Sequence, residues 1–352
     1  MTPLLFCAIL NLGSFNDKHK KGVNLKTKKR KKLTSQDYWF IFALAVVFLG
    51  TLALMTLPDP SKNTVSSTET NAINIQVVWT TNSLQSAYAP DTTTNDIVGD
   101  TLDRMDQLYA FVANELQSDA NLIRLFSKER AIAITRDQFE ADLGKLRGLE
   151  LTFVGQLHES VNSAGYPIKE VQSHIAELVR ELCDVMWTEE FTGGSQITAE
   201  KGCSQFIEES SESDIPAFRN FNDPESTKAY MMRSSPLHAS FQLLFDPRSR
   251  IEVRGADYLP VKALQQHFME YELPANIRGP LPKILTPAQK TLIMRTLSDV
   301  RNLYALRYIA LNADRSKRNT LVLGTYHANH IAYIMSKYGV KCSFILPEVS
   351  KH

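Results

Sequence analysis

The chain has 352 residues, with 39 Lys and Arg against 38 Asp and Glu and a formal net charge of +1. A hydrophobic content of 43% excludes a disordered chain, 15 Gly and 15 Pro exclude a collagen-like sequence, and four Cys exclude a disulfide scaffold. The near-neutral total hides a division, because residues 1–37 hold nine Lys or Arg and only two Asp. Residues 38–57 hold no charged side chain, so residues 58–352 carry 30 basic and 36 acidic side chains.

The uncharged run at 38–57, YWFIFALAVVFLGTLALMTL, predicts a single transmembrane helix. Its length matches the roughly 20 residues needed to cross the hydrocarbon core of a bilayer. Tyr38 and Trp39 stand at one edge, where amphipathic rings prefer the headgroup region, and Pro58 closes the other edge. A buried core helix is the alternative, but such a helix rarely follows a block of nine basic residues.

The basic stub at 1–37 predicts the orientation of this span, because cationic flanks stay on the cytoplasmic side. We expect the stub to contact anionic lipid and not nucleic acid. The main domain then lies outside the cytoplasm. The chain has no Asn-x-Ser/Thr sequon, which favours a bacterial inner-membrane protein whose main domain faces the periplasm.

Residues 58–96 are rich in Ser, Thr, Asn and Pro and read as a polar linker with a short strand at 75–79. Apolar residues then recur at helical spacing over 102–116, followed by helical stretches at 122–130 and 135–146. This helical region, 97–149, is expected to pack on the main domain. It could also mediate self-association into a homo-oligomer.

From residue 150 the pattern alternates between short apolar runs and amphipathic stretches. Strands are expected at 151–154, 185–188, 251–253, 320–323 and 342–346, and helices at 171–182, 286–311 and 329–337. The acidic stretch at 193–227 is expected to be a loop or lid. The alternation predicts an α/β domain over 150–352, with a central, mostly parallel sheet flanked by helices.

Candidate site residues are sought at the carboxyl ends of the strands, where open α/β sheets bind ligands. Two strands are followed by the same pattern of Gly, two residues and His, which places His158 and His327 there. The second strand ends in Glu189 and Glu190, and of these Glu190 is expected to be a surface residue. His238 has no partner pattern in the sequence.

The chain resembles the TraB/ChaN/erythromycin-esterase-like superfamily, which includes the Tiki metalloproteases, over roughly residues 150–347. The resemblance rests on GQLHES at 155–160, EEF at 189–191, RGAD at 254–257, RNLYALRYI at 301–309 and LGTYHANHIAYIMSKYGV at 323–340. These segments match, in order, the family's first Gly-x-x-His, strand-end Glu, Gly-x-Asp, helical Arg and late Gly-x-x-His. Gln156 departs from the pattern, since many members have Glu or Thr there.

The resemblance implies roles for five residues. His158 and His327 match the paired histidines, Glu189 the strand-end acid and Arg301 the helical arginine. Glu159 resembles an acid often found in the erythromycin-esterase and ChaN branches. Asp257 matches the recurring Gly-x-Asp, whose role in the family is open.

Two mechanisms fit these residues. In one, His158, Glu189 and His327 hold a divalent metal ion whose bound water attacks an ester or amide. In the other, a histidine acts as general base on water without metal, and Arg301 stabilises the oxyanion. Both describe a hydrolase of an unknown small-molecule or peptide substrate.

Two other readings remain open. ChaN-like members resemble haem or iron binders, and Tyr326 and His330 would then join His327 as candidate ligands. The α/β domain could instead be a non-catalytic scaffold, with the helices at 97–149 recruiting a partner.

Overall fold

The computed structural model describes residues 75–82, 96–157, 168–212, 221, 223–270 and 284–351. The predicted basic stub and transmembrane helix lie outside these residues. Within the described ranges, no helix is long and apolar enough to cross a membrane.

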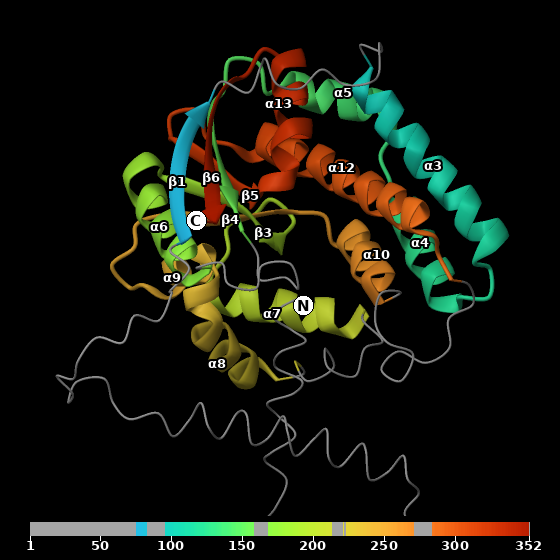
Figure 1. The fold of residues 1–352 in the computed structure, drawn as a ribbon, viewed down its shortest axis with the longest axis horizontal. Helices are drawn as coiled ribbons and strands as arrows, with labels where there is room; N and C mark the ends of the chain where they lie inside the picture. The colour runs from blue at the N-terminus through green and yellow to red at the C-terminus, as the bar shows by residue number, and fades with distance from the viewer. Residues whose placement is uncertain are drawn as a thin grey trace, which may run out of the picture. The chain divides into compact units, whose positions relative to one another are not determined.

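A six-stranded sheet forms the centre of the described part, with strand order β1-β6-β2-β5-β3-β4 (Figure 1). The strands are β1 (Ile75–Asn82), β2 (Glu150–Gln156), β3 (Val185–Thr192), β4 (Glu252–Asp257), β5 (Asn319–Gly324) and β6 (Lys341–Lys351). β1 runs antiparallel to β6, and the neighbouring pairs from β6 to β4 are all parallel. The predicted α/β class with a mostly parallel sheet is therefore confirmed, as is the short strand predicted at 75–79 within the linker.

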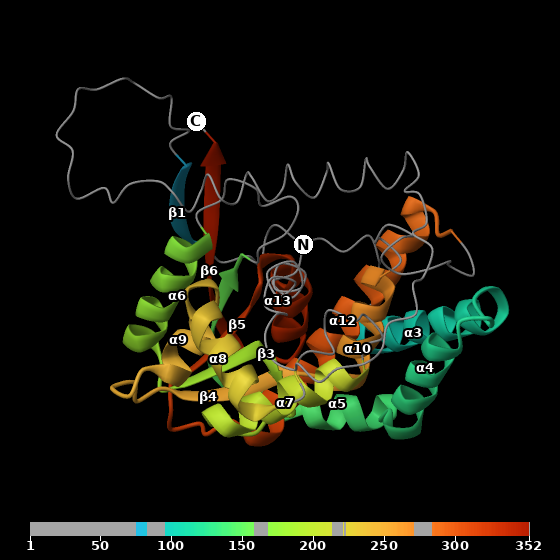
Figure 2. The ribbon, with the colours of Figure 1, turned by 90° about the horizontal axis from the view of Figure 1, so that it is seen from below.

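Helices cover both faces of the sheet, and Figures 1 and 2 show α6 and α9 on one side with α12 and α13 on the other. The first layer is α6 (Ile168–Leu182), α7 (Ala199–Glu212), α8 (Pro224–Ser234) and α9 (Ala239–Phe245). The second layer is α3 (Ile97–Glu115), α4 (Ala120–Ile132), α5 (Arg136–Gly144), α10 (Leu259–Glu270), α12 (Pro287–Asn312) and α13 (Ala328–Lys337).

The alternation of side chains along each strand divides the interior into two cores. Phe153 of β2 and Trp187 of β3 pack into the core under α12, with Trp187 fully buried. Val154 and Met186, one residue away on the same strands, pack into the core under α6. Because both faces of the central strands are buried, their sequences read as continuous apolar runs.

The helical region before the α/β domain shares the α12 core. α3, α4 and α5 contribute Val112, Phe126 and Phe139, all at most 1% exposed. Phe139 packs edge to face against Tyr304 of α12, with ring centroids 4.9 Å apart. The apolar stripe that predicted these helices is thus buried against the main domain.

The prediction of a loop or lid at 193–227 is wrong. The stretch contains α7 and the start of α8, because Cys203 and Phe206 lie on one face of α7 and pack into the α6 core. The overlooked signal for α8 is Asp223 followed by Pro224: the Asp223 side chain accepts from the backbone N–H of Ser226, and proline suits the first helical turn. α9 and α10 were not predicted either.

Candidate active site

The strand residues that begin the two Gly-x-x-His motifs lie side by side because β2 and β5 are neighbours, with Gln156 paired to Gly324 in register. Residues 158–167 lie outside the described part, so the structure does not place His158 or Glu159. Gly324 is required by close packing: a Cβ there would lie 2.6 Å from the ring of Tyr326 and 3.5 Å from Oε1 of Glu189.

Glu189 lies at the centre of the site, on the part of β3 that continues past the predicted strand end. Its side chain is buried, and both carboxylate oxygens accept hydrogen bonds. Oε1 accepts from the backbone N–H of Gly324 at 2.6 Å and from Nε2 of Gln156 at 3.2 Å. Oε2 accepts from Nη2 of Arg301 at 3.1 Å. These donors fix the carboxylate in one orientation.

Arg301 reaches this carboxylate from the middle of α12. Its Nε and Nη2 donate to the two oxygens of Asp257 at 2.8 and 2.6 Å, and its Nη1 donates to Gln265 of α10. The guanidinium is therefore buried and bound to three side chains. This geometry positions Glu189 against the end of β4 and leaves Arg301 little capacity to bind a substrate oxyanion.

His327 lies in the short 3₁₀ turn that joins β5 to α13, and it is 2% exposed. Its Nε2 lies 3.4 Å from Oε2 of Glu189. Both ring nitrogens are buried and neither meets hydrogen-bond geometry with a partner in the described part, so the approach of Nε2 to Glu189 is a close polar contact. Burial lowers the pKa of the ring, and the nearby Glu189 carboxylate only partly offsets this effect. His327 is therefore held as a neutral imidazole near neutral pH.

Gln156 connects Glu189 to the neighbouring Glu190. Its Nε2 donates to Oε1 of Glu190 at 3.1 Å, besides its bond to Glu189. Its Oε1 accepts from Nε2 of Gln172 at 3.4 Å, and Gln172 in turn accepts from the backbone N–H of Ala239. This chain of amides turns the donor end of Gln156 toward both carboxylates. An acid at position 156 could not donate these bonds once ionised.

The expectation that Glu190 is a surface residue is wrong, since it is 8% exposed. It accepts from Thr188 and Gln156, and Nδ1 of His238 lies 3.6 Å from its Oε1. The prediction failed because β3 extends to Thr192, which carries Glu190 inside the sheet and not beyond it. No sequence pattern indicates that His238 lies beside Glu190.

Lys262 of α10 connects the acidic stretch at 193–227 to the end of β3. Its Nζ donates to the backbone carbonyls of Glu189 and Glu190 at 3.3 and 3.2 Å, and to Glu209 of α7 at 3.1 Å. Burial lowers the pKa of Lys262, but the carboxylates of Glu209 and Asp257 outweigh that effect and raise it overall. The charged amine therefore links α7 and α10 to the end of β3.

The two residues predicted as further cofactor ligands differ in their relation to this network. Tyr326 belongs to it: its ring lies against that of His327, its hydroxyl forms a hydrogen bond with Arg301, and burial raises its pKa. His330 is buried between α3 and α12, where Nδ1 is 3.1 Å from the amide of Asn302 and Nε2 is 3.4 Å from the hydroxyl of Thr101. Burial lowers the pKa of His330 to about 3, so this ring is neutral. No described contact favours the haem alternative, which stays a prediction.

The described residues do not by themselves form a divalent metal site, and the third predicted ligand, His158, lies outside them. Both oxygens of Glu189 already accept N–H donors, and a guanidinium lies 3.1 Å from one of them. A cation bound there would be repelled by Arg301. Within the described part, no three His, Cys, Asp or Glu side chains are grouped to hold a metal.

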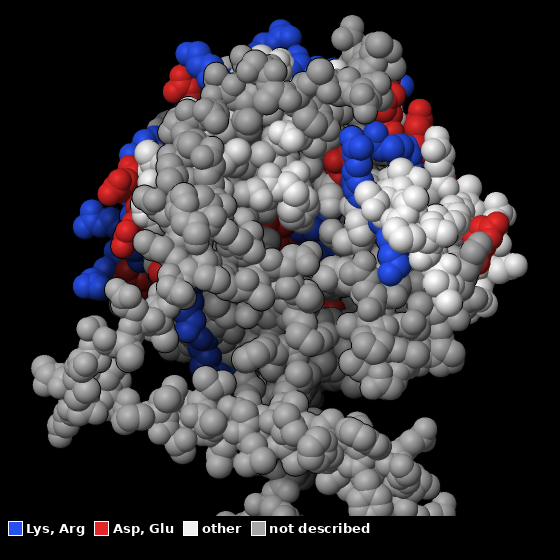
Figure 3. Space-filling view, in the orientation of Figure 1, with Lys and Arg blue, Asp and Glu red and all other residues white. Residues whose placement is uncertain are grey.

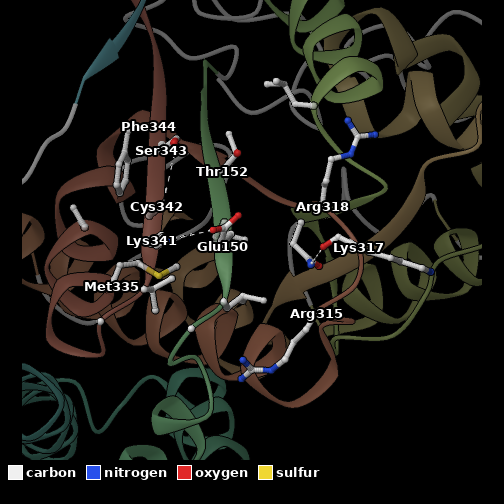
Figure 4. A pocket seen from close by; sticks show the side chains of 18 of the residues that line it. Glu150, Thr152, Arg315, Lys317, Arg318, Met335, Lys341, Cys342, Ser343 and Phe344 are labelled. Atoms are coloured by element: carbon white, nitrogen blue, oxygen red, sulfur yellow. Dashed lines mark hydrogen bonds and ion pairs between the residues drawn. The ribbon is translucent and has the colours of Figure 1, made fainter.

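Acidic and basic atoms appear together in a recess near the middle of one face (Figure 3). A different hollow, of about 880 Å³, lies at the amino ends of the strands, where β2, β5 and β6 begin (Figure 4). Its basic side chains are already engaged: Lys341 pairs with Glu150 at 3.3 Å and Arg318 with Asp184 at 2.9 Å. This second hollow therefore offers little free charge to a ligand.

Comparisons of the chain with protein-family models, with curated proteins and with solved structures found no match. The resemblance to the TraB/ChaN/erythromycin-esterase-like superfamily accordingly stays a prediction.

Proposed function

We propose that the chain is a hydrolase of ester or amide bonds that works without a bound metal ion. The observation that carries the proposal is the convergence of Glu189, Arg301 and His327. These come from β3, α12 and the turn after β5, yet Arg301 and His327 both lie within 3.4 Å of Oε2 of Glu189. The resemblance implies roles for the same three residues.

In the proposed reaction His327 is the general base. An ionised carboxylate only accepts hydrogen bonds, so the ring presents Nε2–H to Glu189 and keeps its lone pair on Nδ1. Nδ1 takes a proton from water while the water oxygen attacks the substrate carbonyl carbon. Glu189 stabilises the imidazolium that forms. Arg301, held by Asp257, is a positioning residue that keeps Glu189 in place.

The experiment uses the full chain in detergent, with p-nitrophenyl butyrate as the ester and an N-acyl p-nitroanilide as the amide. We expect turnover of at least one of them, and loss of about 100-fold or more in kcat for His327→Gln. His267→Gln is the matched control, because His267 also forms a buried contact with a carboxylate, 2.8 Å from Asp119, but on α10 away from the strand ends. Absence of wild-type turnover, or equal loss in both variants, would refute the proposal.

We further propose that residues 38–57 anchor the protein in a membrane as a single span, with residues 1–37 cytoplasmic and the hydrolase domain in the periplasm. The support is the uncharged 20-residue run preceded by nine basic side chains. Protease added to spheroplasts should degrade the α/β domain and spare an epitope placed at the N-terminus. Protection of both parts would contradict the orientation.

A further inference from the structure

A second histidine and carboxylate lie beside the first pair. His238 stands at the start of α9, and its Nδ1 is 3.6 Å from Oε1 of Glu190. Nδ1 is buried and has no hydrogen-bond partner in the described part. The ring of His238 packs on Phe241, with centroids 4.6 Å apart. The imidazole therefore lies between the Glu190 carboxylate and the Phe241 ring.

Gln156 joins the two pairs into one array. The same amide nitrogen lies 3.2 Å from Glu189 and 3.1 Å from Glu190. The carboxylate that contacts His327 and the carboxylate that contacts His238 are therefore held next to each other. Each histidine reaches the array from a separate element, His327 from the turn after β5 and His238 from the start of α9.

The two rings differ in their access to the surface. The His327 side chain is 1% exposed, whereas that of His238 is 11% exposed. Since Nδ1 of His238 is buried, the exposed part belongs to the rest of the ring. His238 is thus suited to meet a departing group that leaves toward solvent, while His327 is suited to hold a water inside the site.

We propose that His238, held by Glu190, is the general acid that protonates the leaving group of the substrate. This role rests on the proposed hydrolase function. His238 begins with a proton on each ring nitrogen, one directed at Glu190 and one on Nε2. As the tetrahedral intermediate collapses, the bond from carbon to the leaving oxygen breaks, its electron pair goes to that oxygen, and the oxygen takes the Nε2 proton. The proton that His327 took from water returns to His238 through solvent.

The test compares two butyrate esters with different leaving groups in the full chain. p-Nitrophenolate leaves without a proton, whereas ethoxide needs one. We expect His238→Gln to lower kcat for ethyl butyrate by about 100-fold and to change kcat for p-nitrophenyl butyrate by only a few fold. His327→Gln should reduce both rates. His174→Gln, on α6, is the control and should reduce neither.

Equal effects of His238→Gln on the two esters, or no effect on either, would overturn the role of His238 while leaving the hydrolase intact. Failure of the wild-type protein to hydrolyse either ester would instead overturn the hydrolase proposal, and the role of His238 with it. Circular dichroism reports whether His238→Gln folds. If His238→Gln does not fold, the Glu190→Gln variant tests the role of His238 instead. This variant should show the same selective loss of kcat for ethyl butyrate.

Discussion

Arg301 binds Asp257 through two parallel hydrogen bonds, from Nε to Oδ1 at 2.8 Å and from Nη2 to Oδ2 at 2.6 Å. Such a fork is specific to the planar guanidinium, and lysine cannot reproduce it. The pair joins the middle of α12 to the end of β4, with Glu189 bound on the same Nη2. The position of Glu189 therefore depends on the shape of the Arg301 side chain as well as on its charge.

Arg301→Lys should lower kcat by about 100-fold, because Lys keeps the charge but loses the two-point contact that positions Glu189. Arg307→Lys is the matched control. Arg307 lies on the same helix and pairs with Asp142 at 2.8 Å, away from the strand ends. Its turnover should stay close to that of the wild type. Similar kcat values for the two variants would show that the charge alone suffices.

The pH profile of kcat/KM should remain flat to below the usual histidine pKa. Burial lowers the pKa of His327 below its usual 6.5, so the base stays neutral and active until the pH falls below that lowered pKa. The acid limb of the profile should thus lie below pH 6.5, and His327→Gln should abolish it. An acid limb at or above the usual histidine pKa would contradict this assignment.

Chelators should leave turnover unchanged. Both Glu189 oxygens accept N–H donors, so we expect dialysis against EDTA or 1,10-phenanthroline to remove no essential ion. Elemental analysis of the dialysed protein checks that any bound metal has gone. Loss of turnover that is restored by Zn²⁺ or Mn²⁺ would favour the metal-dependent mechanism instead.

Glu129 of α4 should make the fold less stable as the pH rises. It is 4% exposed, and burial raises its pKa from 4.5 to about 7. The folded protein keeps the proton that the unfolded chain releases, so stability is full below pH 4.5 and is lost as the pH approaches 7. Glu129→Gln should remove this loss, on the order of 2 kcal/mol. Urea denaturation at pH 5 and pH 8 measures this difference in the free energy of unfolding.

The control for that measurement is Glu115→Gln, at an exposed position on α3. It should retain the pH dependence of the wild type. If Glu129→Gln also retains it, burial of Glu129 is not its source.

Gly255→Ala should destabilise the fold by about 1–3 kcal/mol through overpacking. A Cβ at Gly255 would lie 2.6 Å from the carbonyl carbon of Thr192, where β3 and β4 shift register, and backbone atoms cannot rotate away. Gly144→Ala serves for comparison, since no atom lies within 4 Å of its Cβ position. Thermal unfolding of both variants should separate them, and equal midpoints would argue against crowding at Gly255.

The alternating pattern after residue 150 was enough to predict the sheet, because buried parallel strands and amphipathic helices have distinct periodicities. The resemblance named Glu189, Arg301 and His327 as candidates, and the structure brings these three side chains together. It could not identify the contacts of Glu190, since two adjacent glutamates at a strand end usually lie at the surface. Their burial depends on Gln156 and Lys262, which are 34 and 72 residues away from Glu190 in sequence. Local patterns carry no information on such partners.

The position of β5 has a consequence for how the protein is made. β5 and β6 come from residues 319–351, yet they are the two neighbours of β2, and β5 alone separates β2 from β3. A ribosome therefore releases β1 to β4 before the two strands that pair with β2. Until β5 and β6 emerge, both edges of β2 and one edge of β3 are unpaired, which favours aggregation. A premature stop codon shortly before residue 319 would remove the centre of the molecule and not a dispensable tail.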